Sequence, residues 1–381
     1  MAGGWIGRAA GATVVGLFVA AAAAMLTAAT AAGARAELLV GVAGPLTGRY
    51  QARGLEAQIG TELAVAELNA AGGVLGEPVQ VVTADDACDP DQAVAVARGL
   101  AARGVVLVVG HSCSGAAIAA APVYVEARIV QISPSATNPR LTTAGWPTVF
   151  RVSGRDDQQG AMAGDYLARR WGGARIAILH DGTTYGRGLA EETRARLRAD
   201  GATEALFLAY APAAVDFSHE AARLVEAGID AVYIGGRETE AALIVLQARA
   251  AGSDAAVVAG DALVSDDFWL IAGQAADGAV FTFAPDPAAT PAAAAVVERL
   301  RAQGLLGPVG YTLHAYAAVQ AWAQAADHAG TTASGAVAEA LRRHAFDTVL
   351  GTIGFDANGD VTGIPTYVWY TWQDGDYREL P

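Results

Sequence analysis

Short apolar runs alternate with amphipathic stretches along most of the chain. The runs ELLVGVAGP (37–45), PVQVVTADD (78–86) and VVLVVG (105–110) are rich in valine and end in small or polar residues. The stretches EAQIGTELAVAELNAAGG (56–73) and PDQAVAVARGLAAR (90–103) space their apolar residues as helices do. This alternation predicts parallel strands joined by helices, which is the arrangement of an α/β sheet.

The same pattern continues to about residue 283. Further strands are predicted at IVQIS, RIAILHD, ATEALFLAY, DAVYIGG, AAVVAGD and GAVFTF. About ten β units are too many for one small sheet, so the sequence predicts two doubly wound lobes. In such sheets, ligands bind where loops leave the carboxyl ends of the strands.

Composition supports a large folded core and narrows the class of partner. The 381 residues are 53% hydrophobic and 17% charged, which is ample material for one or two globular domains. The formal net charge is −14, and every basic residue is an arginine. This acidic balance argues against nucleic acid as a partner.

Residues 1–36 have the pattern of a secretory signal. Arg8 supplies a positive start, residues 12–32 form an alanine-rich apolar stretch, and Ala34-Arg35-Ala36 is a small-x-small cleavage site. The alternative is an N-terminal membrane anchor, but no polybasic flank follows the apolar stretch. We therefore expect export to the periplasm with cleavage near Ala36.

The stretch VVGHSCSGAA (108–117) places a histidine, a cysteine and two serines after an apolar run. In an exported protein, the two cysteines, Cys88 and Cys113, are more often paired than catalytic or metal-bound. Ser114 lacks the G-x-S-x-G elbow of a hydrolase, and His111 with one nearby thiol falls short of a zinc site. We expect no metal and no cofactor here.

Ser114 has two interpretations on local sequence alone. It lies near the start of a predicted helix, where free N–H groups and the helix dipole suit an anion. The other interpretation is that Ser114 only caps this helix.

Several segments together resemble one family. They are ELNAAGGVLGEPVQVVTADDACDPDQAVAVA, GHSCSG, ISPSATNPRLT, ILHDGTTYGRGLA, DFSHEAARLVEAGIDAVYIGG and QARAAG. The chain resembles the branched-chain amino-acid binding proteins of ABC transporters, whose leucine, isoleucine and valine receptors link the corresponding cysteines in a disulfide. The resemblance implies a Cys88–Cys113 disulfide and a type I periplasmic-binding fold. In that fold, two lobes joined by three crossover strands close around one small ligand.

The resemblance also implies domain limits and a role. The first lobe would comprise residues 37–155 and 285–365, and the second residues 156–284 and 366–381. We expect a monomeric solute-binding protein, not an enzyme, that delivers an amino acid to an ABC permease and ATPase complex at the inner membrane. The alternative is a ligand-sensing module of the same fold that signals rather than transports.

Four polar-loop positions match ligand-binding positions of the family. Ser114 matches a serine that binds the ligand α-carboxylate, and Thr137 matches a threonine that contacts carboxylate and ammonium. Ser135 stands where a backbone carbonyl receives the ammonium, and Ala136 belongs to the same ligand-binding segment.

Three more positions match from other parts of the chain. Asp261 aligns with an acidic residue that pairs with the ammonium from the opposite lobe, although it is shorter than the usual glutamate. Tyr185 and Tyr311 match aromatic pocket positions. The alternative for each tyrosine is packing against its own lobe.

Two arginines depart from the family pattern. Arg53 and Arg237 stand where the branched-chain receptors usually place aromatic rings over the aliphatic side chain. We therefore expect a ligand with a polar or acidic side chain. The alternative is that both guanidinium groups point to solvent or pair with Glu56, Glu238 or Glu240, which would leave an aliphatic pocket intact.

Overall fold

The computed structural model describes residues 1, 37–302, 304 and 310–381. The predicted signal, with Arg8 and the cleavage site at residues 34–36, therefore lies outside the described residues. Leu38–Pro381 forms one compact unit, and it contains the described helices and strands. Among the described residues, no helix is both long and apolar enough to cross a membrane.

The first sheet has five parallel strands in the order β2-β1-β3-β4-β5. Their bounds are β1 (Leu38–Gly44), β2 (Val79–Asp85), β3 (Leu107–Gly110), β4 (Val130–Ser133) and β5 (Val149–Arg151). Alternate residues face opposite cores, as the period of a strand requires. Val40 and Val42 pack with α2 (Gln51–Ala70) and α12 (Thr312–Ala329), whereas Ala43 packs with α3 (Pro90–Ala102) and α4 (Ser114–Glu126).

The second sheet has seven strands in the order β15-β14-β10-β9-β8-β6-β7. Their bounds are β6 (Ile176–His180), β7 (Leu206–Ala209), β8 (Ala231–Gly235), β9 (Ala256–Ala259), β10 (Val280–Phe283), β14 (Val368–Gln373) and β15 (Asp376–Glu379). Strands β14 and β15 are antiparallel to their neighbours, and the others run parallel.

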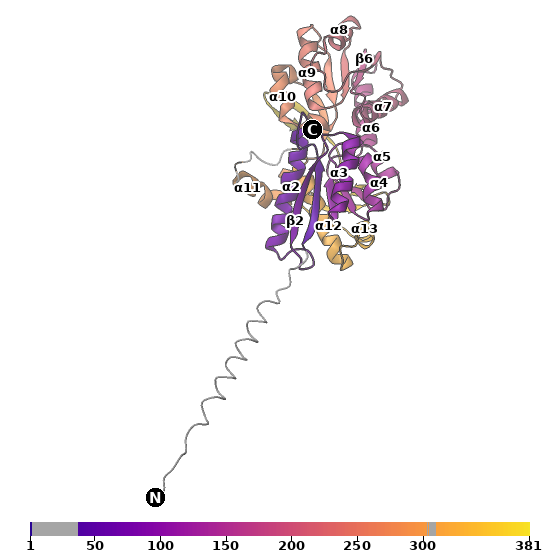
Figure 1. The fold of residues 1–381 in the computed structure, drawn as a ribbon. Coiled ribbons are helices and arrows are strands. Elements are labelled where there is room, and N and C mark those ends of the chain that lie inside the picture. The colour runs from indigo at the N-terminus through magenta and orange to yellow at the C-terminus, as the bar shows by residue number, and fades with distance from the viewer. Residues whose placement is uncertain (2–36, 303, 305–309) are drawn as a thin grey trace. The chain divides into compact units, whose positions relative to one another are not determined.

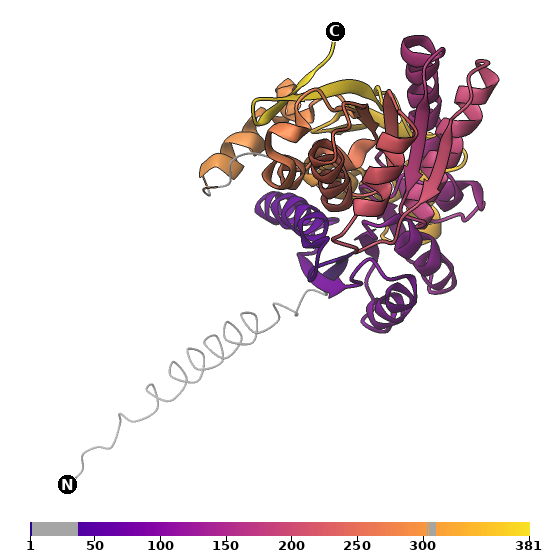
Figure 2. The same ribbon diagram turned by 90° about the horizontal axis from the view of Figure 1, so that it is seen from above.

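Helices cover both faces of the second sheet. One face packs against α6 (Asp156–Trp171) and α7 (Thr184–Ala199), and the other against α8 (Ser218–Glu226), α9 (Glu238–Ala250) and α10 (Asp266–Ala272). These layers can be followed from above in Figure 2.

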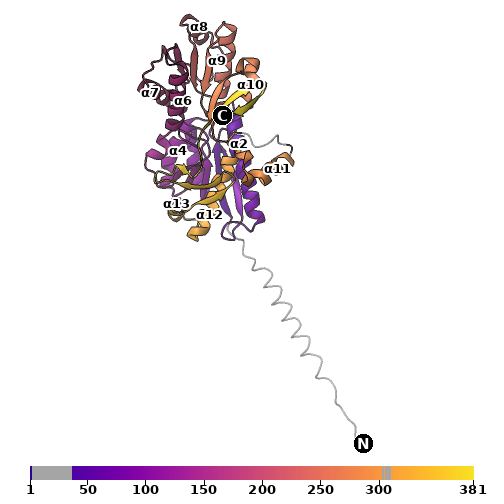
Figure 3. The ribbon, with the colours of Figure 1, turned by 180° about the vertical axis from the view of Figure 1, so that it is seen from behind.

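The remaining elements join the core of the first sheet. They are α5 (Arg140–Thr143), α11 (Ala294–Ala302), α13 (Ser334–Arg343) and the small antiparallel sheet of β11 (Phe346–Thr348), β12 (Gly351–Phe355) and β13 (Val361–Thr362). Trp322 on α12, Leu341 on α13 and Ile353 on β12 are fully buried in the same cluster as Val40. Figures 1 and 3 show these helices gathered with α2 and α4, while α6 to α10 gather around the second sheet.

The chain crosses between the two sheets three times, after β5, after β10 and after β13. This confirms the prediction of an α/β fold with two doubly wound lobes and three crossovers. The residue limits assigned to the lobes, 37–155 with 285–365 and 156–284 with 366–381, stay a prediction.

Strand order reverses once in each sheet. In the first sheet, β1 lies between β2 and β3, and in the second β6 lies between β7 and β8. Loops that leave the carboxyl ends of such neighbouring strands diverge to opposite faces and leave a crevice for a ligand. The topology thus points to the loops after β1 and β3 and to those after β6 and β8.

Helix α2 crosses α12 at Gly60, and this contact is open to a direct test. An added Cβ at Gly60 would collide with the carbonyl oxygen of Thr312, whereas one at Gly99 on α3 would meet nothing. We expect Gly60→Ala to lower the free energy of unfolding by about 1–3 kcal/mol, because the backbone of α2 or of α12 must shift to make room for the methyl group. Gly99→Ala is the control and should raise it by up to about 1 kcal/mol, since alanine favours helix. Urea unfolding measures both, and equal effects would contradict the prediction.

Candidate ligand-binding site

The loops at both strand reversals meet around an inner cavity. Its water-accessible volume is about 10 Å³, which leaves room for about one water molecule. Its lining consists of Arg53, Ser112, Ser114, Ser135, Tyr185, Arg237, Asp261, Ala262 and Tyr311.

An outer cleft of about 720 Å³ adjoins this cavity. Ser114, Tyr185 and Arg237 line both spaces. The outer cleft is further lined by Tyr50, by the Cys88 and Cys113 loops, by residues 181–184 after β6, and by Tyr210. Side chains from the segments that follow the strands of both sheets therefore line one continuous site.

The structure brings seven of the nine predicted ligand-binding residues to the inner cavity. The two others, Ala136 and Thr137, do not line it. The Ala136 carbonyl accepts a hydrogen bond from Arg151 Nη1 at 3.0 Å, and the Thr137 carbonyl accepts one from the Asp156 N–H at 2.9 Å. Both carbonyls are used to hold the loop after β4 in place, next to Ser135.

Ser114 is the first residue of α4, and Cys113 occupies the N-cap position. Cys113 makes no side-chain capping bond, and the Ser114 hydroxyl accepts a hydrogen bond from the Asn138 N–H at 3.3 Å. The interpretation of Ser114 as only an N-cap is therefore wrong. The neighbouring Ser112 carbonyl accepts from the Ser135 hydroxyl at 3.0 Å, which ties the loops after β3 and β4 together.

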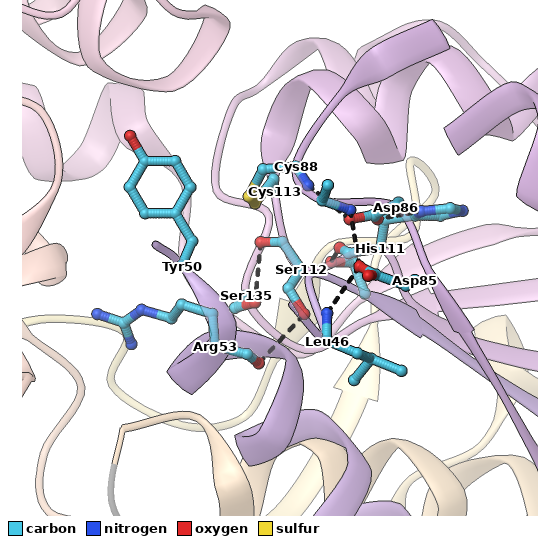
Figure 4. Close-up of a disulfide and its surroundings, with 12 residues drawn as sticks. Leu46, Tyr50, Arg53, Asp85, Asp86, Cys88, His111, Ser112, Cys113 and Ser135 are labelled. Atoms are coloured by element: carbon cyan, nitrogen blue, oxygen red, sulfur yellow. Dashed lines mark hydrogen bonds and ion pairs between the residues drawn. A yellow bond between two sulfur atoms is a disulfide. The ribbon is translucent and has the colours of Figure 1, made fainter. Parts of the chain in front are cut away.

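A disulfide joins Cys88 to Cys113, with their Cα atoms 5.5 Å apart. Beside it, buried His111 contacts the Asp86 carboxylate through Nδ1 at 2.6 Å and the Tyr124 hydroxyl through Nε2 at 2.9 Å. Figure 4 shows the disulfide together with Asp86 and His111, which lie in the same two loops. Because both ring nitrogens of His111 are occupied, it cannot act as a base for Ser114 in hydrolysis.

Asp261 lines the inner cavity, and both oxygens of its carboxylate accept hydrogen bonds. Its Oδ1 accepts from the Tyr185 hydroxyl at 2.8 Å and from Gln159 Nε2 at 3.0 Å, and its Oδ2 accepts from the Tyr311 hydroxyl. Burial, reinforced by Asp261, raises the pKa of both tyrosines, so they remain donors. Burial next to Asp261 also raises the pKa of Asp156 well above its usual range. Asp261 is the one carboxyl group among the residues that line the inner cavity.

Arg53 is buried and fully engaged. Its Nη2 donates to the Ala262 carbonyl at 2.9 Å, and its guanidinium lies 3.3 Å from Glu56 and 3.9 Å from Glu238. Burial alone would lower the pKa of Arg53, but Glu56 and Glu238 raise it above its usual value. Its charge is therefore already neutralised by protein groups. The sequence left open whether Arg53 pairs with Glu56 or Glu238, and in the structure it lies close to both.

Arg237 differs from Arg53 in its partners. It is half-buried and forms no ion pair with any residue that the structure describes. Its guanidinium carbon lies 4.8 Å from the centre of the Tyr50 ring and 5.6 Å from that of Tyr185, which holds it by cation–π contact. A cation is therefore held at the junction of the inner cavity and the outer cleft.

Sequence reasoning missed several residues of the site. Ser112 and Ala262 line the inner cavity, Tyr50 lines the outer cleft, and Gln159 orients Asp261. Ser112 lies in the same GHSCSG segment as Ser114, so proximity in sequence was an available signal. Gln159 offered none, because only the fold brings α6 to Asp261.

The fold and the loop geometry agree with the comparison to known proteins. The family model for periplasmic binding proteins matches residues 37–376. The chain belongs to the periplasmic binding protein family. This is a family of solute-binding proteins rather than enzymes, and the branched-chain amino-acid group within it is the one that the sequence resembles.

Relatives of this periplasmic binding protein cover nearly its whole length. A Leu/Ile/Val-binding protein homolog 1 from Brucella suis is 43% identical over 349 residues, which are 91% of this chain and 94% of the relative. An amino acid binding protein from Pseudomonas aeruginosa is 42% identical over 352 residues, with the same coverage of both chains.

Two solved structures are similar over the same span. The leucine binding protein LivK from Thermotoga maritima has a TM-score of 0.83 at 27% identity, with 90% of this chain and 98% of that one covered. The branched-chain amino acid transporter substrate binding protein LivJ from Streptococcus pneumoniae, in complex with isoleucine, has a TM-score of 0.81 at 27% identity and covers 91% and 99%.

The buried pairing of Arg53 predicts a stability effect. Arg53→Ala leaves Glu56 and Glu238 buried without their cation, so we expect the free energy of unfolding to fall by about 3–5 kcal/mol. Arg169→Ala is the control, because this exposed arginine pairs only with Asp165 on the same helix and its loss should cost less than about 0.5 kcal/mol. Chemical unfolding of both variants checks this, and an unchanged Arg53→Ala protein would contradict it.

Proposed function

We propose that this protein is an extracytoplasmic solute-binding protein that captures an amino acid with a polar or acidic side chain and delivers it to an ABC importer. The preference for a polar or acidic ligand side chain rests on Arg237. This cation lies at the junction of the inner cavity and the outer cleft and has no ion-pair partner among the described residues. An apolar side chain placed against it would desolvate the guanidinium without replacing its hydrogen bonds, which is costly. A polar group would satisfy it.

The rest of the cavity suits the zwitterionic part of an amino acid. Ser114 stands at the start of α4, where unpaired N–H groups and the helix dipole favour the α-carboxylate. Asp261 provides a carboxylate for the ammonium from the other sheet, and the Ser135 carbonyl is a second acceptor. Donors on one side and a carboxylate on the other match the two charges of the ligand.

Capture requires the cleft to widen, because the inner cavity holds no more than about one water molecule. Direct contacts join the two sides of the cleft. Arg49 and Tyr50 directly precede α2. Arg49 Nη1 lies 3.0 Å from Glu240 Oε1 on α9, and the Tyr50 hydroxyl lies 3.2 Å from the same oxygen. Asn138 donates to the Thr184 carbonyl at 2.8 Å. Closure would bring these groups and the ligand contacts together, and ligand binding to both sides would favour the closed state.

Transport follows from the resemblance rather than from the site. The similar Streptococcus pneumoniae protein is a transporter substrate binding protein, and we extend that role to this chain, with periplasmic export by residues 1–36, a monomeric state and an ABC permease as partner. A sensing role would instead predict that deletion of the gene alters a response but leaves uptake of the ligand intact.

A ligand panel tests the proposed function. Calorimetry with aliphatic, acidic, amide and aromatic amino acids should show binding of polar or acidic ones. Arg237→Ala should weaken that binding about 10- to 100-fold, because a charge-assisted hydrogen bond is lost. Arg169→Ala is the exposed control and should bind as the wild type does. Preference for leucine, isoleucine or valine would show that the side-chain assignment is wrong, and binding of no amino acid would refute the function itself.

The contacts of Glu240 predict a change in cleft opening. Glu240→Gln keeps the size of the side chain but removes the ion pair with Arg49, so the ligand-free protein should populate open conformations about fivefold more, as expected for about 1 kcal/mol. Small-angle X-ray scattering should report a larger radius of gyration, which ligand reduces. Glu191→Gln, which removes an exposed pair on α7, is the control. Identical scattering from the two variants would contradict the role of Glu240.

A further inference from the structure

The outer cleft holds a charge opposite to that of Arg237. Asp181, directly after β6, lines this cleft and is 2% exposed. Its Oδ1 accepts both hydrogen bonds from Thr183, from the N–H at 2.9 Å and from the hydroxyl at 2.7 Å. None of the hydrogen bonds between described residues uses Oδ2. Asp181 therefore has an acceptor left for a ligand.

A buried hydroxyl lies beside the same group. Tyr210 lines the cleft and is 4% exposed, and its hydroxyl has no hydrogen-bond partner among the described residues. The hydroxyl lies against Gly236, where an added Cβ would collide with it and would come 3.5 Å from Asp181 Oδ2. A buried hydroxyl without a partner is unusual in folded proteins. Tyr210 places an unsatisfied hydroxyl in this wall of the cleft, close to Asp181.

The charges around the cleft disfavour a second carboxylate on the ligand. Arg53 is already matched by Glu56 and Glu238, and Arg49 by Glu240. The outer cleft is then lined by Arg237, Asp181 and Asp89, and Asp89 Oδ1 already accepts from the Gln92 N–H at 2.8 Å. In the inner cavity, Asp261 is reserved for the ligand ammonium. A carboxylate next to Arg237 would also be repelled by Asp181 in a partly desolvated site, where charges interact strongly. A neutral group that accepts from Arg237 and donates to Asp181 satisfies both.

We propose that the ligand's side chain ends in a carboxamide or ureido group held between Arg237 and Asp181. The amide oxygen accepts from the Arg237 guanidinium, and the amide NH₂ donates to Asp181 Oδ2. One carboxamide therefore supplies the acceptor that Arg237 needs and the donor that Asp181 needs. Tyr210 supplies a further hydroxyl next to Asp181. This inference rests on the proposed function, because it requires the cavity to hold the amino-acid end of the ligand.

The test compares ligands that differ only in the terminal group. Calorimetry with the wild-type protein should show that glutamine, asparagine or citrulline binds at least about tenfold more tightly than glutamate or aspartate. Asp181→Asn should reverse this order, because Asn keeps the Oδ1 acceptor for Thr183 and presents an NH₂ donor in place of Oδ2. Asp254→Asn is the matched control, since Asp254 is exposed, and it should leave the order unchanged.

The outcomes separate the two proposals. Tighter binding of glutamate than of glutamine by the wild type, or an unchanged ratio in a folded Asp181→Asn protein, would overturn the carboxamide assignment while the proposed function stands. Binding of aliphatic amino acids alone would overturn both side-chain assignments. Binding of no amino acid would overturn the proposed function as well. The wild-type ratio decides the matter even if the variant does not fold.

Discussion

The arrangement of the cleft depends on how one buried cation is neutralised. Arg53 lies on α2 next to the first sheet. Its partners are Glu56 one turn along the same helix, Glu238 at the start of α9, and the carbonyl of Ala262 after β9. A guanidinium that loses water must find charge and hydrogen bonds in the protein. Arg53 therefore binds the two sides of the cleft together and leaves Arg237 as the cation that faces the ligand space.

Asp261 and Asp181 divide the cleft into two chemical environments. Asp261 accepts from two tyrosine hydroxyls and from Gln159, so its carboxylate is fixed in the inner cavity. Asp181 is held through one oxygen only, and it faces the larger outer space together with Arg237. The rigid inner site suits the part that all amino acids share, whereas the outer site, with unsatisfied donors and acceptors, suits the part that distinguishes them.

Much of the architecture could be predicted from the sequence, because local pattern determines it. The alternation of apolar runs and amphipathic stretches predicted β1–β4 and β6–β10, but it did not predict β5, the small sheet of β11–β13, or β14 and β15. Cys88 with Cys113 indicated a disulfide in an exported protein. The positions of Ser114, Tyr185, Asp261 and Tyr311 at one cavity were also anticipated. Ala136 and Thr137 were placed at the cavity and do not line it, and their carbonyls accept hydrogen bonds from Arg151 and from the start of α6.

The sequence by itself determined the fold class and the disulfide candidates, since these depend on the local pattern and on residue type. The loops that meet at the site were indicated by the resemblance to a known family. The sequence could not distinguish Arg53 from Arg237, which are the same residue type and both stand where the related receptors usually place aromatic rings. Only the tertiary structure decided that distinction, because Glu238 and the Ala262 carbonyl reach Arg53 from distant segments. Glu238 and Glu56 reach Arg53, whereas Arg237 is directed between the rings of Tyr50 and Tyr185. The charge available to a ligand is therefore a property of packing, not of sequence position.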